Sequence, residues 1–306
     1  MISDIQSEII KLKKEKGVTI FAHTYQSHDI IEIADVVGDS FFLSKKAKED
    51  KNPIAVVCGV HFMAETVKML SPEKTVILAN ETAGCPMAEQ FTAEEILKFK
   101  AENNNPTVVS YINATAEIKA VSDIAVTSGS ALKICKNAKT DNILFIPDCN
   151  LGNYIKENIP EKKVTLINGG CPVHSAITEE EAIKAKELHP DALFLVHPEC
   201  KPCVVKHADY VGSTAGIMEY ARNSDKKEFI IGTENSVVEH LQFECPDKKF
   251  YPLSKNLICI DMRATTLNDV LNAVKGEGGK EITLSDEISE KAVHCINEML
   301  RLENIQ

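Results

Sequence analysis

The chain has 306 residues, of which 44% are hydrophobic and 26% are charged, a composition typical of a globular protein with a substantial core. The formal net charge is −11 and no basic tract occurs, which argues against a nucleic-acid-binding protein. The longest nearly apolar run, 54–64, is far shorter than the roughly 20 residues of a membrane-spanning helix. The N-terminus lacks the pattern of a signal peptide, so we expect a cytosolic protein that does not enter the membrane.

Short apolar runs alternate with helix-like stretches along the chain, an order typical of parallel sheets with helices on both faces. Capping-box patterns at Ser3, Thr92 and Thr178 mark expected helix starts. Beyond Arg263 we expect two more helices, 267–274 and 285–302. The predicted strands are 18–22, 54–57, 76–79, 108–111, 143–146, 164–167, 193–196, 229–231 and 257–260.

Several features recur at intervals of 86 to 88 residues, which identifies an internal repeat. We therefore predict an α/β fold with three α/β/α sandwich domains, related by a pseudo-threefold axis, with short parallel sheets around a central active site. The expected domains are 1–88, 89–174 and 175–262, with 263–306 packing back on the first. The recurring residues are the strand ends His23, Tyr111 and His197, the aspartates Asp35, Asp123 and Asp209, the hydroxyls Ser40, Ser128 and Thr214, and the cysteines Cys85, Cys171 and Cys259.

The three periodic cysteines are expected near the carboxyl ends of strands, where open parallel sheets bind ligands. Three domains around one axis would bring the three thiols together. Such a set fits either a four-iron cluster with one open iron or a zinc site with an exchangeable fourth position. The alternative is that Cys-Pro only forms a turn, with Cys85 and Cys171 buried in the core.

The periodic hydroxyls precede or begin expected helices, whose N-termini can hold a carboxylate or a phosphate. The simpler interpretation of each hydroxyl is an ordinary N-cap. His174, three residues after Cys171, is either a donor to a cluster sulfur or a surface residue. For Cys200 and Cys203 a structural or accessory redox role is favoured over metal binding. Groups able to move protons near the strand ends are His23, Tyr25, Tyr111, Asn113, His197 and Glu199.

The order of motifs along the chain resembles the quinolinate synthase family. The similarity runs almost from end to end, although the segment around Cys259 matches only loosely. The matching segments are AHTYQ (22–26), IADVVGDS (33–40), CGVHFMAET (58–66), AGCPMAE (83–89), SYINATAEIKAVSD (110–123), TSGSA (127–131), IPDCNLG (146–152), GGCPVH (169–174), HPEC (197–200) and GSTAG (212–216).

This resemblance implies an enzyme of NAD biosynthesis that condenses iminoaspartate with dihydroxyacetone phosphate to give quinolinate, phosphate and water. It implies a [4Fe-4S] cluster on Cys85, Cys171 and Cys259, with one open iron as Lewis acid. The candidates for proton transfer are Tyr25, Tyr111 and Glu199. L-aspartate oxidase or aspartate dehydrogenase would supply the imine. The implied substrate-binding residues are His23, Ser40, Tyr111, Ile112, Asn113, Ser128, His197, Pro198, Glu199 and Thr214.

Two other functions remain open at this point. One is a cluster-dependent hydro-lyase that acts on another small dicarboxylate. The other is a non-enzymatic iron–sulfur sensor, although the sequence contains no basic stripe or DNA-binding helix that a sensor would use.

Overall fold

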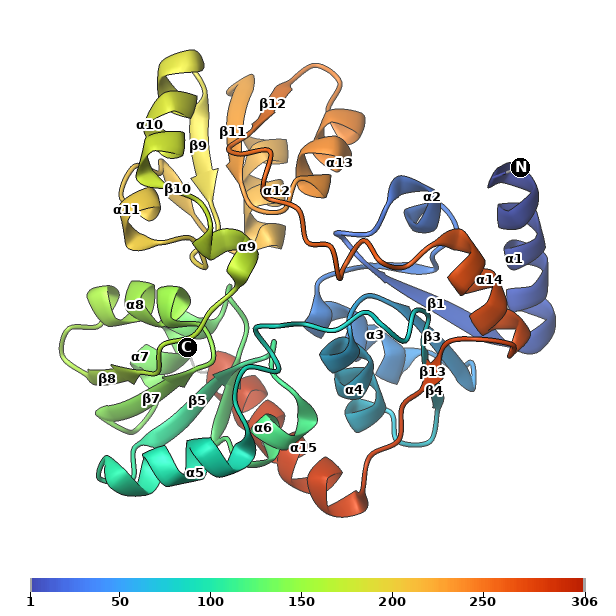
Figure 1. Cartoon of the computed structure of the whole chain (residues 1–306), viewed down its shortest axis with the longest axis horizontal. Helices are drawn as coiled ribbons and strands as arrows, with labels where there is room; N and C mark the ends of the chain where they lie inside the picture. Colours follow the sequence, from blue (N-terminus) through green and yellow to red (C-terminus); the bar gives the residue numbers. More distant parts are fainter. Residues whose placement is uncertain (1, 305–306) are drawn as a thin grey trace. The chain divides into compact units, whose positions relative to one another are not determined.

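A computed structural model describes residues 2–304 and contains three short sheets flanked by helices (Figure 1). The first sheet is formed by β1 (Val18–His23), β2 (Val36–Gly38), β3 (Ile54–Cys58), β4 (Thr75–Leu78) and β13 (Lys280–Glu281). Its order is β13-β4-β3-β1-β2, and all pairs are parallel except the short edge strand β13.

The second and third sheets repeat the strand order of the first. The second, β6-β5-β7-β8, contains β5 (Thr107–Tyr111), β6 (Ile124–Val126), β7 (Asn142–Ile146) and β8 (Lys163–Leu166). The third, β10-β9-β11-β12, contains β9 (Leu193–Val196), β10 (Tyr210–Val211), β11 (Glu228–Gly232) and β12 (Lys249–Pro252). In each sheet the first strand lies between the second and the third, which confirms the predicted α/β class with three α/β/α units.

Helices connect the strands, as parallel pairing requires. Thr92 and Thr178 form the capping boxes that the sequence predicts, each with a glutamate at the third helical position. The helices are α1 (Ile2–Lys16), α2 (His28–Ile31), α3 (Ser40–Glu49), α4 (His61–Leu70), α5 (Ala93–Glu102), α6 (Ala116–Ala120), α7 (Ala131–Asn137), α8 (Cys149–Asn158), α9 (Pro172–Ser175), α10 (Glu179–Leu188), α11 (Pro202–Val205), α12 (Thr214–Asn223), α13 (Ser236–Glu244), α14 (Leu267–Lys275) and α15 (Asp286–Glu303).

The chain forms two compact units. The first consists of Met1–Glu89, Ile112–Ala120 and Ile260–Val293, and contains the first sheet. The second consists of Gln90–Tyr111, Val121–Cys259 and His294–Gln306, and contains the second and third sheets. The three domain boundaries expected from the repeat stay a prediction.

The core of the first compact unit lies between its parallel strands and the helices α1 and α14. Ile9 of α1 and Val270 of α14 are fully buried in one cluster with Ile20 and Val56 of the strands. Helix α14 begins with a capping box at Thr266 and ends at Gly276, whose φ of 79° is readily adopted by glycine. None of the helices in residues 2–304 combines the length and the apolar character that crossing a bilayer requires.

The periodic aspartates are structural. Each accepts the amide N–H of a first-strand residue through Oδ2, at 2.7–2.9 Å, and each pairs with a lysine from the helix that precedes that strand. The aspartate therefore fastens a helix to the sheet in every repeat. The triplets are Lys13–Asp35–Ile20, Lys100–Asp123–Val108 and Lys186–Asp209–Phe194.

Two local predictions are wrong. The run 257–260 is a loop: Leu257 is buried, but Ile258 and Ile260 are 42% and 77% exposed, so their apolar character does not reflect packing in a sheet. The last strand of the third sheet is β12, which lies at the interval that the repeat requires. Ser3 is not an N-cap, because it lies inside α1 and its backbone oxygen accepts a hydrogen bond from Ser7 Oγ.

Candidate functional site

The loops that carry the three periodic cysteines have the same backbone anchor. In each repeat a helix follows the third strand. A backbone N–H at the start of this helix donates to the carbonyl oxygen two residues before the cysteine; the donor is the first helical residue in the first two repeats and the N-cap in the third. The bonds run from His61 to Ala83, from Cys149 to Gly169 and from Asn235 to Leu257, at 2.9, 2.8 and 2.8 Å. The third loop is therefore equivalent to the others, although its sequence matches the family only loosely.

A thiol–imidazole–carboxylate group lies in the second compact unit, with a half-buried cysteine and a buried histidine and glutamate. Potential ligand atoms of Cys171, His174 and Glu199 all lie within 4.8 Å of one another. His174 Nδ1 is 3.2 Å from the Cys171 sulfur and 3.1 Å from Glu199 Oε2, and His174 Nε2 is 3.2 Å from Thr233 Oγ1. His174 is only 3% exposed, so its interpretation as a surface residue is wrong. Its imidazole can hold both the thiol and the carboxylate in place.

Glu199 is the charged centre of this group. Burial by itself raises the pKa of the carboxyl, but the charges of His197 and His174 and hydrogen bonds from His174 and Tyr111 outweigh it and lower the pKa to about 2. Tyr111 is the last residue of β5 in the second sheet and is 5% exposed. Its hydroxyl donates a hydrogen bond to Glu199. Tyr111 and Glu199, two of the three predicted proton-transfer residues, are thus in contact.

Asp148 is a second buried carboxyl that the sequence analysis did not single out. It is the N-cap of α8: Oδ1 accepts the Leu151 N–H at 2.7 Å, and Oδ2 accepts the Cys171 N–H at 2.9 Å. Burial and the neighbouring negative charge of Glu199 raise its pKa to about 7. One feature of the sequence could have identified Asp148: another acidic residue, Glu234, lies one repeat interval further along the chain.

His23 and His197 have the same local geometry. In each, the backbone N–H two residues further on donates to Nδ1: Tyr25 to His23 at 3.0 Å, and Glu199 to His197 at 3.2 Å. This bond leaves the ring proton of the neutral imidazole on Nε2. Burial lowers the pKa of both rings to about 4, so at neutral pH each histidine is an uncharged donor.

Two of the periodic hydroxyls, Ser40 and Thr214, lie one residue beyond an N-cap, whereas Ser128 lies two residues before Ser130, the N-cap of α7. Asp39 and Ser213 are the caps of α3 and α12, accepting the N–H groups of Phe42 and Gly216. Ser40 and Thr214 are the first residues of these helices, so their interpretation as N-caps is wrong. Thr127, which precedes Ser128, exchanges hydrogen bonds with Ser130 at the start of α7.

The segment with Ile112 and Asn113 is held from within the first compact unit. Glu65 Oε2 accepts the Ala116 N–H at 2.9 Å, and the fully buried Lys119 donates to Thr66 Oγ1 at 3.0 Å and to the Ala114 carbonyl oxygen. Ile112 is 2% exposed and Asn113 is half-buried. A buried amine and a buried carboxylate therefore fix the loop that carries Asn113.

The predicted site residues divide between the two compact units. His23 and Tyr25 contact each other edge to face, with ring centroids 4.5 Å apart. The first unit contains His23, Tyr25, Ser40, Cys85, Ile112 and Asn113; the second contains Tyr111, Ser128, Cys171, His197, Pro198, Glu199, Thr214 and Cys259.

Two cavities are lined by residues close in the sequence to predicted site residues. One of about 630 Å³, in the first compact unit, is lined by Gly84 and by the acidic residues Glu65, Glu81, Glu89 and Glu117. Lys280 also lines this cavity, but the acidic side chains outnumber it and disfavour an anionic substrate.

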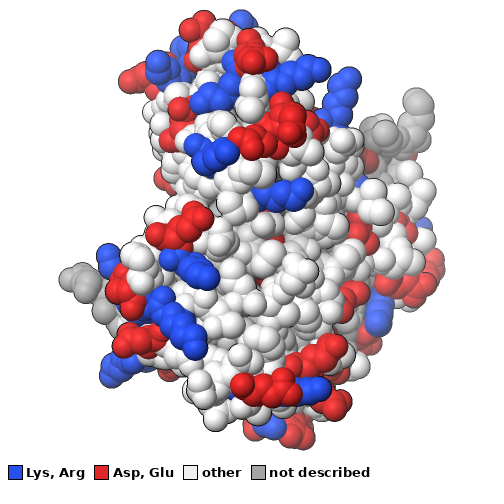
Figure 2. All heavy atoms as spheres, turned by 60° about the vertical axis from the view of Figure 1, so that its left-hand side comes forward, with Lys and Arg blue, Asp and Glu red and all other residues white. Residues whose placement is uncertain are grey.

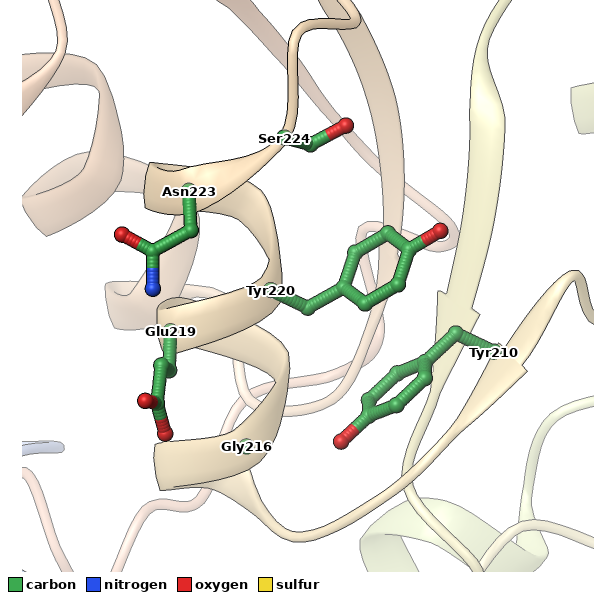
Figure 3. Close-up of a pocket in the computed structure, with 6 residues that line it drawn as sticks. All are labelled: Tyr210, Gly216, Glu219, Tyr220, Asn223 and Ser224. Atoms are coloured by element: carbon green, nitrogen blue, oxygen red, sulfur yellow. The ribbon is translucent and has the colours of Figure 1, made fainter.

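The other cavity, of about 430 Å³, is lined by Tyr210 and Tyr220, whose rings stack 4.6 Å apart (Figure 3). A Cβ at Gly212 or Gly216 would come within 2.6–2.7 Å of the Tyr210 ring or hydroxyl. The two glycines therefore let Tyr210 pack against the start of α12, where Thr214 lies.

Cys200 and Cys203 pack in the hydrophobic core of the third sheet. Burial raises the pKa of the Cys200 thiol well above its usual value, with the charges of Glu199 and Asp148 acting in the same direction. Thiolate formation is thus disfavoured there, which agrees with a structural role. On the face drawn in Figure 2, lysines and arginines are interspersed with acidic side chains, a distribution unlike the basic stripe of a nucleic-acid-binding surface.

Comparison with known proteins gives a consistent result. The family model of quinolinate synthetase A proteins (NadA) matches residues 7–301. The quinolinate synthase of Alkaliphilus metalliredigens is 47% identical over 296 residues, which cover 97% of each chain. That of Caldicellulosiruptor saccharolyticus is 46% identical over 98% of this chain and 99% of the relative. That of Thermodesulfovibrio yellowstonii is 45% identical over 99% of each.

Proposed function

The chain belongs to the quinolinate synthetase A family, and on this basis we propose that it synthesises quinolinate in NAD biosynthesis. The proposed substrates are iminoaspartate and dihydroxyacetone phosphate, and the other products are phosphate and water. L-aspartate oxidase or aspartate dehydrogenase would provide the imine. The observation that carries the proposal is the family match over residues 7–301, within which the half-buried Cys171 and the buried His174, Glu199 and Tyr111 form one polar group.

The proposed cofactor is a [4Fe-4S] cluster held by Cys85, Cys171 and Cys259. Support comes from the equivalent backbone anchors of their loops and from the donor set, since all three are half-buried cysteines that form no disulfide. Three thiolates leave one iron of such a cluster without a protein ligand. When bound, the cluster supplies that open iron as a Lewis acid.

Substrate anions would be held by neutral donors. His23 and His197 present Nε2–H groups that stay uncharged at neutral pH. Ser40 and Thr214 add hydroxyls at the first residues of α3 and α12, where free N–H groups and the helix dipole favour carboxylate and phosphate. Ser128, Asn113, Ile112 and Pro198 complete the proposed binding set.

Proton transfer is assigned to Glu199, Tyr111 and Tyr25. Glu199 is ionised and would accept a proton from the substrate, while the Tyr111 hydroxyl that donates to it keeps the carboxylate oriented. Tyr25, next to His23, would protonate the leaving oxygen. Because Glu199 and its partners are buried, these transfers occur away from bulk water, where electrostatic interactions are stronger.

The test is turnover by protein purified without oxygen. Iminoaspartate, generated in the assay from aspartate, is mixed with dihydroxyacetone phosphate, and quinolinate and phosphate are quantified. We expect both products in equal amounts. A protein that holds the cluster but forms no quinolinate would instead be a hydro-lyase for another dicarboxylate or a sensor, and dehydration assays with small hydroxy-dicarboxylates would separate these two.

A further inference from the structure

The backbone N–H of each periodic cysteine donates to a carboxylate. Cys171 donates to Asp148 Oδ2 at 2.9 Å, Cys85 to Glu89 Oε1 at 3.0 Å, and Cys259 to Glu234 Oε1 at 3.4 Å. A loop amide is satisfied equally well by a carbonyl oxygen or by water. The use of an acidic side chain in all three loops therefore calls for a specific explanation.

In the second and third repeats the carboxylate connects two parts of the structure. Asp148 and Glu234 lie one repeat interval apart, just after β7 and β11, and both are fully buried. One oxygen of each accepts an N–H at the start of the next helix, from Leu151 at 2.7 Å or from Ser236 at 2.8 Å. The other oxygen accepts the cysteine N–H. Each carboxylate therefore ties a cysteine loop to the N-terminus of a helix.

The first repeat makes the same bond with a different residue. The position equivalent to Asp148 and Glu234 is Val60, which precedes α4 and makes no side-chain cap bond. The acceptor is instead Glu89, four residues beyond Cys85, whose own N–H donates to the Cys85 carbonyl oxygen at 3.1 Å. The first repeat has no acidic residue at the equivalent position, yet the cysteine N–H still donates to a carboxylate. The three loops therefore share this hydrogen bond and not the position of its acceptor.

We propose that Glu89, Asp148 and Glu234 are positioning residues for the three cysteine ligands, an inference that rests on the proposed cluster. Each carboxylate fixes its cysteine loop and occupies an amide that could otherwise donate to a cluster sulfur. Hydrogen bonds to the sulfurs raise the reduction potential of an iron–sulfur cluster. By accepting the cysteine N–H groups, the three carboxylates keep this potential low, as suits a centre that acts as a Lewis acid.

The most direct test is Asp148→Asn, because an amide side chain has one acceptor oxygen and cannot serve both Leu151 and Cys171. The variant should bind iron and sulfide when purified without oxygen. Its potential should shift to more positive values in a titration followed by electron paramagnetic resonance. Iron release to a chelator should be about tenfold faster, the usual scale for losing a group that orients a metal ligand.

Two further variants extend the test. Glu234→Gln should change the potential in the same direction as Asp148→Asn. Glu89→Gln should have a smaller effect, because Glu89 is exposed and water can accept the Cys85 N–H in its place.

The matched control is Asp123→Asn, which changes a carboxylate that accepts a backbone N–H and pairs with a lysine but does not contact a cysteine. It should lower stability without moving the potential. Asp148→Glu, which retains both oxygens, should restore the potential at least in part. If Asp148 had only a structural role, Asp148→Asn and Asp123→Asn would both lower stability and neither would change the potential.

Hydrogen exchange of the peptides that contain the three cysteines distinguishes failure of the proposal from failure of the proposed cofactor. If the wild type holds the cluster and Asp148→Asn leaves potential, iron release and exchange unchanged, the inference is overturned. If the wild type holds no iron, the cofactor proposal fails. The positioning role then stands only if amide exchange at Cys171 accelerates in Asp148→Asn and not in Asp123→Asn.

Discussion

At the scale of single residues, removal of the Tyr111 hydroxyl, which donates to Glu199, tests the proposed proton transfer. Tyr111→Phe should retain iron, because no cysteine changes, but should lower kcat about a hundredfold, within the usual range for a misplaced proton-transfer group. Without the hydrogen bond from Tyr111 the pKa of Glu199 rises. The acid limb of the pH–rate profile should therefore move to higher pH, as steady-state kinetics can measure.

Tyr251→Phe is the matched control for that variant. The Tyr251 hydroxyl also donates to a glutamate, Glu228, at 3.0 Å, but this pair lies on β12 and β11 away from the candidate site. The activity and the pH–rate profile of Tyr251→Phe should equal those of the wild type. Equal kinetics for Tyr111→Phe and Tyr251→Phe would remove Tyr111 from the proton-transfer residues.

At the scale of secondary-structure elements, the lysine–aspartate pair that recurs in each repeat joins one helix to the central part of its sheet. Asp123→Ala should lower the free energy of unfolding by about 1 kcal/mol, because the Val108 N–H and Lys100 both lose their partner. Urea denaturation monitored by circular dichroism tests this. A control substitution at Asp141, which faces solvent and has no comparable ion pair among the described residues, should leave the midpoint unchanged.

Much of the order of helices and strands could be predicted because the same repeat occurs three times in the chain. The first strands of all three sheets were located to within one or two residues, and the periodic cysteines are in equivalent loops. The strand expected at 257–260 was wrong because an apolar run alone does not distinguish a buried strand from a loop with exposed isoleucines. The period itself indicated the correct place, Lys249–Pro252.

The candidate site was predictable in its residue types but not in its contacts. The burial of His174 depends on Thr233 and Glu199, which are 59 and 25 residues away in the chain. Asp148 likewise acquires its role from Cys171, on a different loop. Such partners are brought together by sheet topology, and a local pattern does not contain that information.

At the scale of the whole molecule, two buried neutral histidines make stability depend on pH. The pKa of His23 and of His197 is about 4 in the folded chain and 6.5 in the ordinary state. Between these values the unfolded chain binds more protons at the two histidines, so their contribution to stability rises with pH from about 4 to 6.5, whereas the raised pKa of Asp148 acts in the opposite direction. Each histidine contributes a loss on the order of 3 kcal/mol across that interval on acidification.

Urea denaturation of wild type and His23→Asn at a series of pH values tests this dependence. The asparagine oxygen can accept the Tyr25 N–H in place of Nδ1 but does not titrate, so the variant should lose less stability than the wild type between pH 6.5 and 4. Parallel curves for the two proteins would show that His23 is not buried in its neutral form.

The central claim is that three equivalent loops each contribute one thiolate to a [4Fe-4S] cluster. Iron and acid-labile sulfide, counted per chain after purification without oxygen, test it most directly. The wild type and Cys203→Ala should each contain about four of both, whereas Cys85→Ala, Cys171→Ala and Cys259→Ala should each lose them. Zinc in the wild type, or a full cluster in any of the three single variants, would contradict the account.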